Sequence, residues 1–301
     1  MHNAPAVAIV ILLVGAVASG PVAADQQVLL REQSLYHTIL VVAEPTRRCL
    51  KFSVRDGTRN QSCVDPHDPK RMVFGYTRMM MAALLVVPEP QAVLVAGLGG
   101  GTLPTALAAL LPDVRIDVVE IDPAVVKVAR TYFDFQDSER VRVHVQDARV
   151  FVKRALQQGR QYDLVILDAY SGDYIPEHLM TAEFLEETRK LLTPDGAVAA
   201  NTFATSQLYD YESETYRLVF GQFFNLRVRT SNNRVIVATN GPLPSRETLR
   251  ANSRAWRPAL GAYDVPITSY PRRMSTKVDW DHTKRALTDQ YSPANLLKGS
   301  R

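Results

Sequence analysis

Charged residues are absent from the first 24 positions of this 301-residue chain, where an apolar or small-residue run extends from Ala6 to Ala18. Val22, Ala23 and Ala24 then form a small-residue pattern typical of a cleavage site. The run is shorter than the roughly 20 apolar residues that a spanning helix needs. We therefore predict a signal peptide over residues 1–24 and an exported protein, periplasmic or secreted. Two alternatives stay open: an uncleaved membrane anchor with a cytoplasmic domain, and a wrongly assigned start codon.

The chain also lacks a lysine–arginine block, although 35 basic residues against 31 acidic ones give a formal charge of +4. Without a basic patch interleaved with aromatics, we expect no nucleic-acid partner. His144, His178 and His282 do not have metal-ligand spacing, so we predict no metal. Neither a Gly-x-Ser-x-Gly elbow nor the Lys-Ser/Thr pair of a P-loop occurs. These two absences disfavour covalent catalysis by a serine and hydrolysis of a nucleoside triphosphate.

Cysteine occurs only twice, at Cys49 and Cys63, in a stretch that loosely alternates apolar and polar residues. Asp56 and Gly57 lie between them and form a strong hairpin-turn pair. A hairpin that turns there places the two cysteines within one register step of each other. A cross-strand disulfide is therefore one hypothesis, and it would suit an exported protein. The other is that both are small buried residues that never bond.

A glycine-rich stretch is the most informative part of the sequence. A buried strand is predicted over 93–96, and four glycines follow that permit a sharp turn and leave main-chain N–H groups open to a ligand: Gly97, Gly99, Gly100 and Gly101. After a predicted helix and a second strand comes Glu120, 120 − 101 = 19 residues beyond the last glycine. Nucleoside-binding α/β folds place their ribose-binding acid at about this spacing. The order predicts a nucleoside pocket; the alternative is a plain structural loop.

Strands and helices alternate along the rest of the chain, and an antiparallel hairpin ends the pattern. Apolar runs predict further strands over 141–146, 162–167 and 197–203. We therefore predict an α/β fold, a doubly wound Rossmann-like sheet. Three strands end in acids: Glu120, Asp147 and Asp168. Because ligands bind beyond the carboxyl ends of such strands, these carboxylates should converge on the glycine turn, although any one of them could instead cap a helix.

Four segments, in this order, resemble the spermidine synthase family and its spermidine-synthase-like relatives: VLVAGLGGGTLP, VVEIDPAVV, VHVQDARVF and YDLVILDAYSGDYIP. The resemblance implies the seven-stranded fold of S-adenosylmethionine-dependent methyltransferases behind a small N-terminal β unit. It also implies a transferase of polyamine biosynthesis, a polyamine aminopropyltransferase. By position, the glycines would line the nucleoside, Glu120 would hold the ribose hydroxyls, and Asp147 would meet the adenine amine.

The reaction that the resemblance implies is displacement at a carbon bonded to a sulfonium, with an amine as the nucleophile. The co-substrate would be decarboxylated S-adenosylmethionine or S-adenosylmethionine, and the partner a small-molecule amine or another nucleophilic acceptor. An ammonium cannot attack, so a carboxylate must take its proton or hold the neutral amine in line. Asp168 stands at the family's catalytic position, and Asp173 and Tyr170 would help to orient the amine. Alternatively, Asp168 caps its loop by an Asx-type bond.

Some residues depart from the family's pattern. Gly100 replaces an aspartate that grips the free amine of the cofactor. Tyr76 and Arg78 are expected on the substrate side, where Arg78 replaces an acid. An arginine there would repel a diamine but pair with a carboxylate, such as that of intact S-adenosylmethionine. An S-adenosylmethionine-dependent methyltransferase is therefore the alternative function, and a non-catalytic nucleoside-binding protein with the same fold is a third.

These observations divide the chain into four predicted parts: a leader at 1–24, a β-hairpin unit at 25–73, a Rossmann-like nucleoside-binding domain at 74–240, and a C-terminal helical extension at 241–301. The extension is predicted to begin with a helix over 245–259. It either covers the edge of the sheet or forms a homodimer contact. The acceptor and the oligomeric state do not follow from the sequence.

Overall fold

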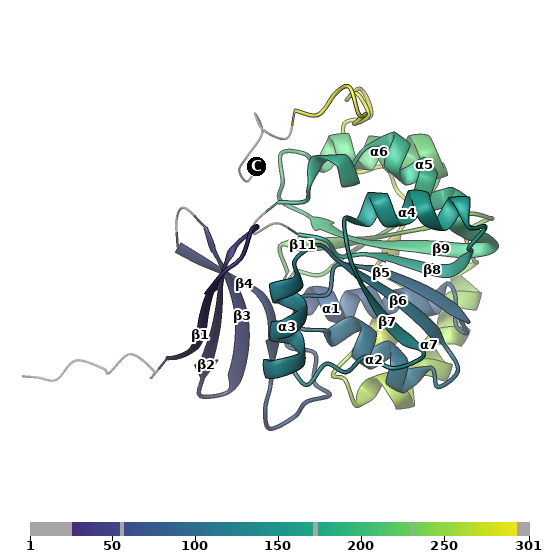
Figure 1. The fold of residues 1–301 in the computed structure, drawn as a ribbon. Coiled ribbons are helices and arrows are strands. Elements are labelled where there is room, and N and C mark those ends of the chain that lie inside the picture. Colours follow the sequence, from purple (N-terminus) through teal and green to yellow (C-terminus); the bar gives the residue numbers. More distant parts are fainter. Residues whose placement is uncertain (1–25, 55–56, 171–173, 230, 294–301) are drawn as a thin grey trace, which may run out of the picture.

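A computed structural model describes residues 26–293 except 55–56, 171–173 and 230. The predicted leader lies outside these residues, as do Asp56 of the predicted turn and Asp173 of the predicted site. The described chain forms a four-stranded antiparallel sheet beside a larger mixed sheet that carries helices on both faces (Figure 1). Within the described ranges, no helix has the length and apolar character needed to cross a membrane.

The large sheet has the order β12-β10-β11-β9-β8-β5-β6-β7. Its parallel strands are β5 (Ala92–Ala96), β6 (Arg115–Glu120), β7 (Val141–Val145), β8 (Tyr162–Leu167) and β9 (Leu192–Phe203). Three antiparallel strands extend it: β11 (Asn233–Thr239), β10 (Phe224–Arg227) and the two-residue β12 (Met274–Ser275). The predicted doubly wound sheet is therefore confirmed, and β12 adds a short eighth strand. Apolar side chains on both faces of β5 and β8 bury most of these central strands, as is usual in parallel sheets.

Helices cover both faces of the sheet (Figure 1). One face packs on α4 (Ala148–Gln157), α5 (Ala182–Leu191) and α6 (Tyr209–Phe220). The other packs on α1 (Gly75–Met80), the 3-10 helix η1 (Met81–Leu85), α2 (Thr102–Leu110), α3 (Pro123–Tyr132) and α7 (Arg246–Gly261). Two further 3-10 turns are η2 (Glu177–Leu179) and η3 (Ile267–Ser269). Residues 75–85 form a continuous helical segment that changes from α to 3-10 geometry after Met80 and ends at Leu85.

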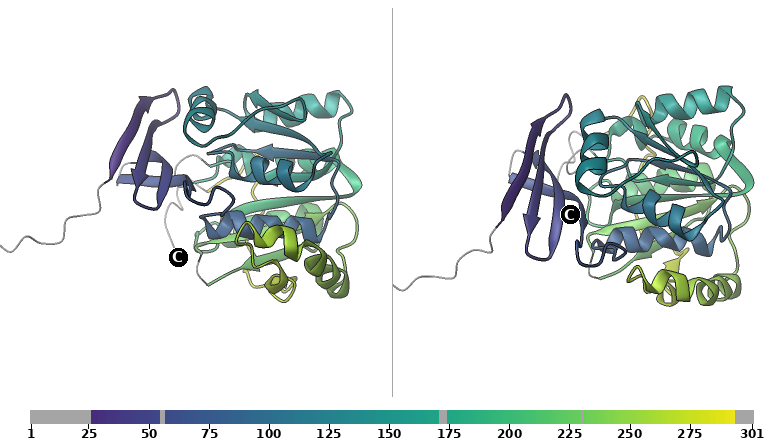
Figure 2. Two further views of the ribbon diagram at one scale, coloured as in Figure 1. Left: turned by 90° about the horizontal axis from the view of Figure 1, so that it is seen from below. Right: turned by 60° about the horizontal axis from the view of Figure 1, so that its bottom comes forward.

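The N-terminal sheet stands to one side of the large one (Figure 2). It runs in the order β1 (Gln27–Gln33), β2 (Thr38–Glu44), β3 (Arg47–Val54) and β4 (Gly57–Val64). Apolar residues of β2 and β3, among them Val41 and Leu50, pack on Val125 and Val128 of α3. Helix α3 also contributes Val126 to the core below the large sheet, so one helix serves both cores.

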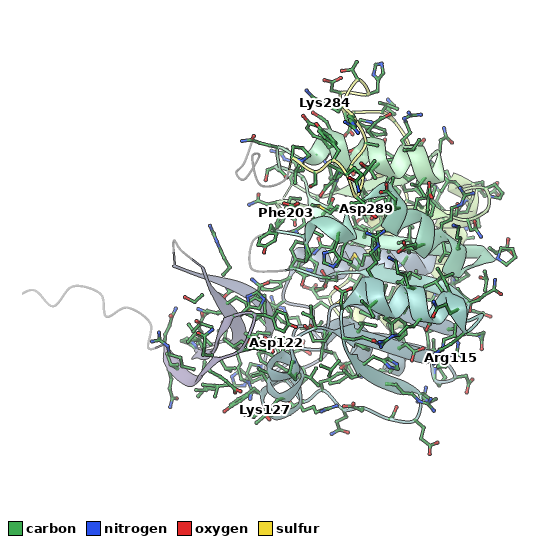
Figure 3. All side chains as sticks on the ribbon, turned by 45° about the horizontal axis from the view of Figure 1, so that its top comes forward. Arg115, Asp122, Lys127, Phe203, Lys284 and Asp289 are labelled. Atoms are coloured by element: carbon green, nitrogen blue, oxygen red, sulfur yellow. A yellow bond between two sulfur atoms is a disulfide. The ribbon has the colours of Figure 1, made fainter. Side chains whose placement is uncertain are left out.

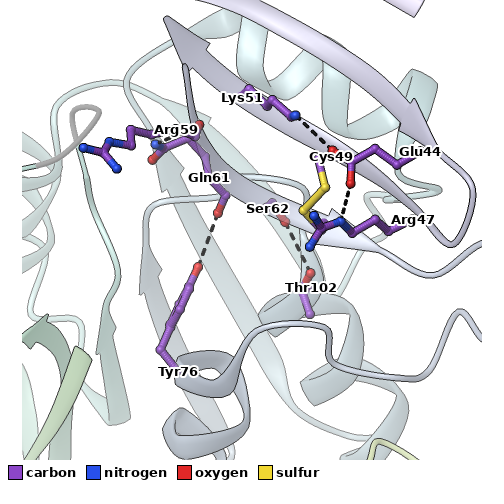
Figure 4. The surroundings of a disulfide bond; sticks show 10 residues. Glu44, Arg47, Cys49, Lys51, Arg59, Gln61, Ser62, Tyr76 and Thr102 are labelled. Atoms are coloured by element: carbon purple, nitrogen blue, oxygen red, sulfur yellow. Dashed lines mark hydrogen bonds and ion pairs between the residues drawn. A yellow bond between two sulfur atoms is a disulfide. The ribbon is translucent and has the colours of Figure 1, made fainter. Parts of the chain in front are cut away.

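The hairpin predicted around the cysteines is present. Cys49 of β3 and Cys63 of β4 face each other directly and form a disulfide (Figure 4), so the disulfide hypothesis is confirmed. Residues 192–196 also belong to β9, where they form an irregularity in its pairing with β8.

A C-terminal strap, residues 281–292, crosses α4, α5 and α6 (Figures 1 and 3). Leu287 is fully buried beside Met180 and Leu208. Its carbonyl accepts from Ala182 N at 2.8 Å, and its N–H donates to Thr215 Oγ1 at 2.9 Å. These contacts fix the strap onto the helical face next to the loop that follows β8.

Candidate active site

A cavity of about 540 Å³ opens between β4 of the N-terminal sheet and the carboxyl ends of the parallel strands. Glu120, Asp147 and Asp168 all line it, so the three acids predicted to converge do so. They come from the ends of β6, β7 and β8, which lie on either side of β5 and its glycine turn. This is where open α/β sheets bind ligands.

The glycine turn forms one wall of the cavity. Gly97 has φ +97°, and a Cβ there would lie 2.3 Å from the carbonyl oxygen of Asp168, so only glycine fits. Gly97 and Gly99 line the cavity, whereas Gly100 and Gly101 do not. The expectation that all four glycines line the site is therefore wrong for these two, because Gly100 faces Ser62 and Phe133 and Gly101 faces Phe135.

Strand β4 of the N-terminal sheet lies against the glycine turn (Figure 4). Ser62 Oγ lies 3.5 Å from Thr102 Oγ1 at the start of α2. A Cβ on Gly100 would come within 2.7 Å of Ser62 Oγ. A hydroxyl from another element thus occupies the space that a side chain at position 100 would need.

Glu120 is held by the glycine turn. Its Oε2 accepts from Leu98 N at 3.0 Å, and its Oε1 accepts from Asp122 N at 3.0 Å. Burial raises the pKa of Glu120, and these backbone donors oppose the rise. Each carboxylate oxygen has a second lone pair, so Glu120 can still accept from two adjacent hydroxyls of a ligand.

Asp147 has two protein partners. Its Oδ1 accepts from Val150 N at 2.9 Å and so caps α4, which is the structural alternative considered for this residue. Its Oδ2 is 2.8 Å from Nε2 of His178, a residue of η2 that also lines the cavity. Asp147 therefore links the carboxyl end of β7 to η2, in the segment that follows β8.

Asp168 lines the cavity and is half-buried. Burial raises its pKa to about 7, against the opposing hydrogen bonds from Asn201 and Tyr76. Asn201 Nδ2 donates to Asp168 Oδ1 at 2.9 Å. The pKa of Tyr76 is in turn held well above its usual value by burial and by the charge of Asp168, so its hydroxyl remains a donor at neutral pH. A carboxyl group with a pKa near 7 can accept a proton and release it again under physiological conditions.

The spermine/spermidine synthase domain matches residues 73–232, which is more than half of the chain. The protein belongs to the spermine/spermidine synthase family. A polyamine aminopropyltransferase of Vibrio vulnificus is 49% identical over 282 residues, covering 92% of this chain and 94% of the relative. The eEF1A lysine and N-terminal methyltransferase of Homo sapiens is 33% identical over 148 residues, 46% of this chain and 21% of that protein. The crystal structure of a probable spermidine synthase from Corynebacterium glutamicum has the same fold, with a TM-score of 0.63, 20% identity and coverage of 88% of this chain and 99% of that one.

On the substrate side, this member of the spermine/spermidine synthase family differs from expectation. Arg78 does not line the cavity, because Nη1 pairs with Asp264 Oδ2 at 2.8 Å beyond α7. The placement predicted for Arg78 is therefore wrong. Tyr76 and Tyr170 do line the cavity, as expected. The Tyr76 hydroxyl oxygen, which hydrogen-bonds to Asp168, also lies 3.4 Å from the Gln61 carbonyl (Figure 4), and the Tyr170 hydroxyl donates to the Asn201 carbonyl at 2.8 Å.

Sequence analysis missed two carboxamides of the site, Asn201 of β9 and Asn233 of β11. Both line the cavity, and Asn233 Nδ2 donates to Asn201 Oδ1 at 3.0 Å. The only signal in the sequence is that Asn201 interrupts the apolar run AVAA of its strand. His37 also lines the cavity; it stacks on Phe52 with ring centroids 4.0 Å apart, and burial lowers its pKa.

Proposed function

We propose that this protein transfers an aminopropyl group from decarboxylated S-adenosylmethionine to a small-molecule amine. The observation that carries the proposal is Asp168, a carboxyl group whose pKa is raised to about 7 and which shares a cavity with the glycine turn and Glu120. Membership of the spermine/spermidine synthase family supports it, as does 49% identity to a polyamine aminopropyltransferase over nearly its whole length.

The donor would lie along the glycine turn. Gly97 and Gly99 leave the main chain accessible there, Glu120 offers its free lone pairs to the ribose hydroxyls, and Asp147 would accept from the adenine amine at the cost of its contact with His178. The negative charge of Asp168 would favour a sulfonium nearby. Among the described residues, no group of three or more His, Cys, Asp or Glu side chains could hold a metal ion.

In the transfer step, the nitrogen of the amine acceptor forms a bond to the propyl carbon next to sulfur. The carbon–sulfur bond breaks, and its electron pair stays on sulfur as neutral methylthioadenosine. The attacking nitrogen must first be uncharged, and Asp168 in its ionised form takes the proton. Tyr76 and Tyr170, which both line the cavity near Asp168, would hold the acceptor in line.

The test compares donors and products. Decarboxylated S-adenosylmethionine with a panel of diamines should yield methylthioadenosine, whereas intact S-adenosylmethionine should yield no S-adenosylhomocysteine. Asp168→Asn should keep the affinity for methylthioadenosine within about twofold by calorimetry, while turnover falls by ~10²–10⁴. Full turnover in Asp168→Asn would reject its role as the base.

Methyl transfer from intact S-adenosylmethionine is the second candidate. One observation favours it: position 100 carries no acid for the donor's free amine, and Ser62 and Phe133 fill the space beside it. The 33% identity to a human methyltransferase over 148 residues agrees with it. The argument from Arg78 no longer supports it, because that arginine pairs with Asp264. Formation of S-adenosylhomocysteine in the donor test would select this candidate.

We propose, finally, that the protein is exported and functions outside the reducing cytoplasm. The disulfide between Cys49 and Cys63 supports this, because such bonds persist mainly in oxidising compartments. Cell fractionation with N-terminal sequencing tests it. A mature protein that begins near Asp25 and co-fractionates with the periplasm or medium is expected, and an intact N-terminus in the membrane fraction would instead favour the anchor.

A further inference from the structure

Three side chains from three neighbouring strands form a continuous line of hydrogen bonds across the inner end of the cavity. Asn233 Nδ2 donates to Asn201 Oδ1 at 3.0 Å, and Asn201 Nδ2 donates to Asp168 Oδ1 at 2.9 Å. The strands that carry them, β11, β9 and β8, are adjacent in the sheet. Asn201 pairs in register with Val235, so Asn233 is its diagonal neighbour, two residues along β11 on the same face.

Asp168, at the end of this line, sets the donor-to-acceptor direction of its hydrogen bonds. An ionised carboxylate only accepts hydrogen bonds, so Asn201 must turn its NH₂ group toward Asp168 and its carbonyl oxygen toward Asn233. Asn233 must then donate, and its own backbone N–H is held by Ser231 Oγ at 3.1 Å. Aligned amides polarise one another, so the bond that reaches Asp168 is stronger than an isolated one.

We propose that Asn233 is a positioning residue for the transfer reaction, acting through Asn201 to hold Asp168 in the orientation that leaves Oδ2 facing the acceptor. A carboxamide neither takes up nor releases a proton at neutral pH, so the line directs the carboxylate without competing for the proton that the amine loses. Oδ1 accepts from Asn201, Tyr76 is a further donor to the same carboxylate, and a remaining lone pair of Oδ2 takes the proton. This inference rests on the proposed function, in which Asp168 is the base.

Other charged and titratable groups around Asp168 do not replace this role. Tyr76 of α1 and Tyr170 of the loop after β8 are un-ionised at neutral pH, because burial raises the pKa of both. Behind Asn201, Glu212 of α6 is fully buried and is paired with Arg234 at 3.2 Å. Asn201 is therefore the donor to Asp168 that is held in place by its own strand, β9, and by Asn233 of the neighbouring β11.

The experiment uses matched asparagines. Asn233→Asp keeps the shape of the side chain but removes its donor, and Asn233→Ala removes the group. Asn232→Asp and Asn232→Ala are the controls: Asn232 also lines the cavity, and its backbone carbonyl, which accepts from Ala204 N at 2.7 Å, is unchanged by either substitution. The control with aspartate adds the same charge one residue away.

Loss of the Asn233 donor should raise the pKa of Asp168, because its ionised form loses stabilisation. The acid limb of the kcat/KM profile should then move to higher pH by about one unit. At pH 7 this lowers kcat/KM about fivefold relative to the wild type, and above about pH 9 the difference disappears. Asn232→Ala should keep the limb within about 0.3 unit of the wild type, and Asn232→Asp should move it less than Asn233→Asp does, because it adds the charge without removing the donor.

A second readout does not need turnover. Carbon-13 NMR titration of the labelled carboxyl groups, with Asp168 assigned by its absence in Asp168→Asn, gives the pKa of Asp168 in the free protein. A larger rise in each Asn233 variant than in the matched Asn232 control supports the inference. An unchanged titration, or equal shifts in the Asn232 controls, overturns it. If the NMR shift appears while the wild type transfers no aminopropyl group, the proposed function fails and the positioning of Asp168 stands.

Discussion

Replacing Asp289 of the C-terminal strap by asparagine should weaken both the fold and donor binding. Asp289 Oδ1 accepts from Arg149 Nη1 at 2.6 Å and Oδ2 accepts from Nη2 at 2.8 Å, while Thr181 Oγ1 donates to Oδ1 at 2.8 Å. Arg149 is nearly buried, also pairs with Glu187, and reaches the carbonyl of His178 at 3.5 Å. The strap therefore supports the loop segment that forms one wall of the cavity.

The expected loss of unfolding free energy is modest. A hydrogen bond to a charged group contributes about 1.5–3 kcal/mol, but the Asp289 side chain is 36% exposed, so solvent screening reduces this. We expect a loss of about 1 kcal/mol in Asp289→Asn at neutral pH. Hydrogen bonding to Arg149 lowers the pKa of Asp289. The contribution is therefore complete above the unfolded pKa near 3.8 and is lost as the pH falls through the lower pKa of the folded state.

Urea unfolding and donor KM measure the two effects. The control is Asp281→Asn, since Asp281 lies in the same strap but its partners, Thr283 and Lys284, lie there too. We expect a lower urea midpoint and a higher donor KM, with kcat nearly unchanged, in Asp289→Asn alone. The reasoning is refuted if both variants lose the same stability, or if the difference between wild type and Asp289→Asn is as large at pH 3 as at pH 7.

Three more predictions concern the site and the N-terminal sheet beside it. Turnover should rise with pH through about 7, because Asp168 must be ionised to take a proton and its pKa is raised to about 7; a rate that is flat between pH 5.5 and 9 would contradict this. Replacing both Cys49 and Cys63 by serine should cost about 3 kcal/mol in urea unfolding, as expected for a bridge with a sequence separation of 14, and reductant should then have no further effect. Gly97→Ala should abolish binding of methylthioadenosine in calorimetry, because its Cβ would lie 2.3 Å from a backbone oxygen, whereas Gly159→Ala, also at positive φ but with no atom within 4 Å, should bind normally.

Local patterns predicted the parts of the fold that depend on short-range physics. The apolar strand before Gly97, the leucine-rich helix after it and the acids that end β6, β7 and β8 all follow from residue type and spacing. Strand β1 was missed because its sequence, QVLLREQ, alternates poorly and lies half exposed at the edge of the sheet. Its place depends on pairing with β2, which a local pattern does not encode.

The errors at the site have tertiary causes. Arg78 follows only three residues after the start of α1, and its direction is set by Asp264, 186 residues away. The link between Asn201 and Asn233 depends on the register of β9 and β11, which is set by the whole sheet. Gly100 does not line the cavity as predicted, because Ser62 of the N-terminal sheet lies against it. Each of these contacts joins residues that are distant in the sequence.

Helix α3 packs against both cores, and this has a consequence for how the protein melts. The apolar residues of the N-terminal sheet have no hydrophobic partner helix of their own; they are covered by Val125 and Val128, while Val126 of the same helix faces the other core. If a protease cut the chain near residue 73 and the two fragments separated, the N-terminal sheet would expose its apolar face. The larger fragment would expose Val125 and Val128 of α3. Scanning calorimetry of the intact chain should accordingly record one cooperative heat-absorption peak for the two sheets together.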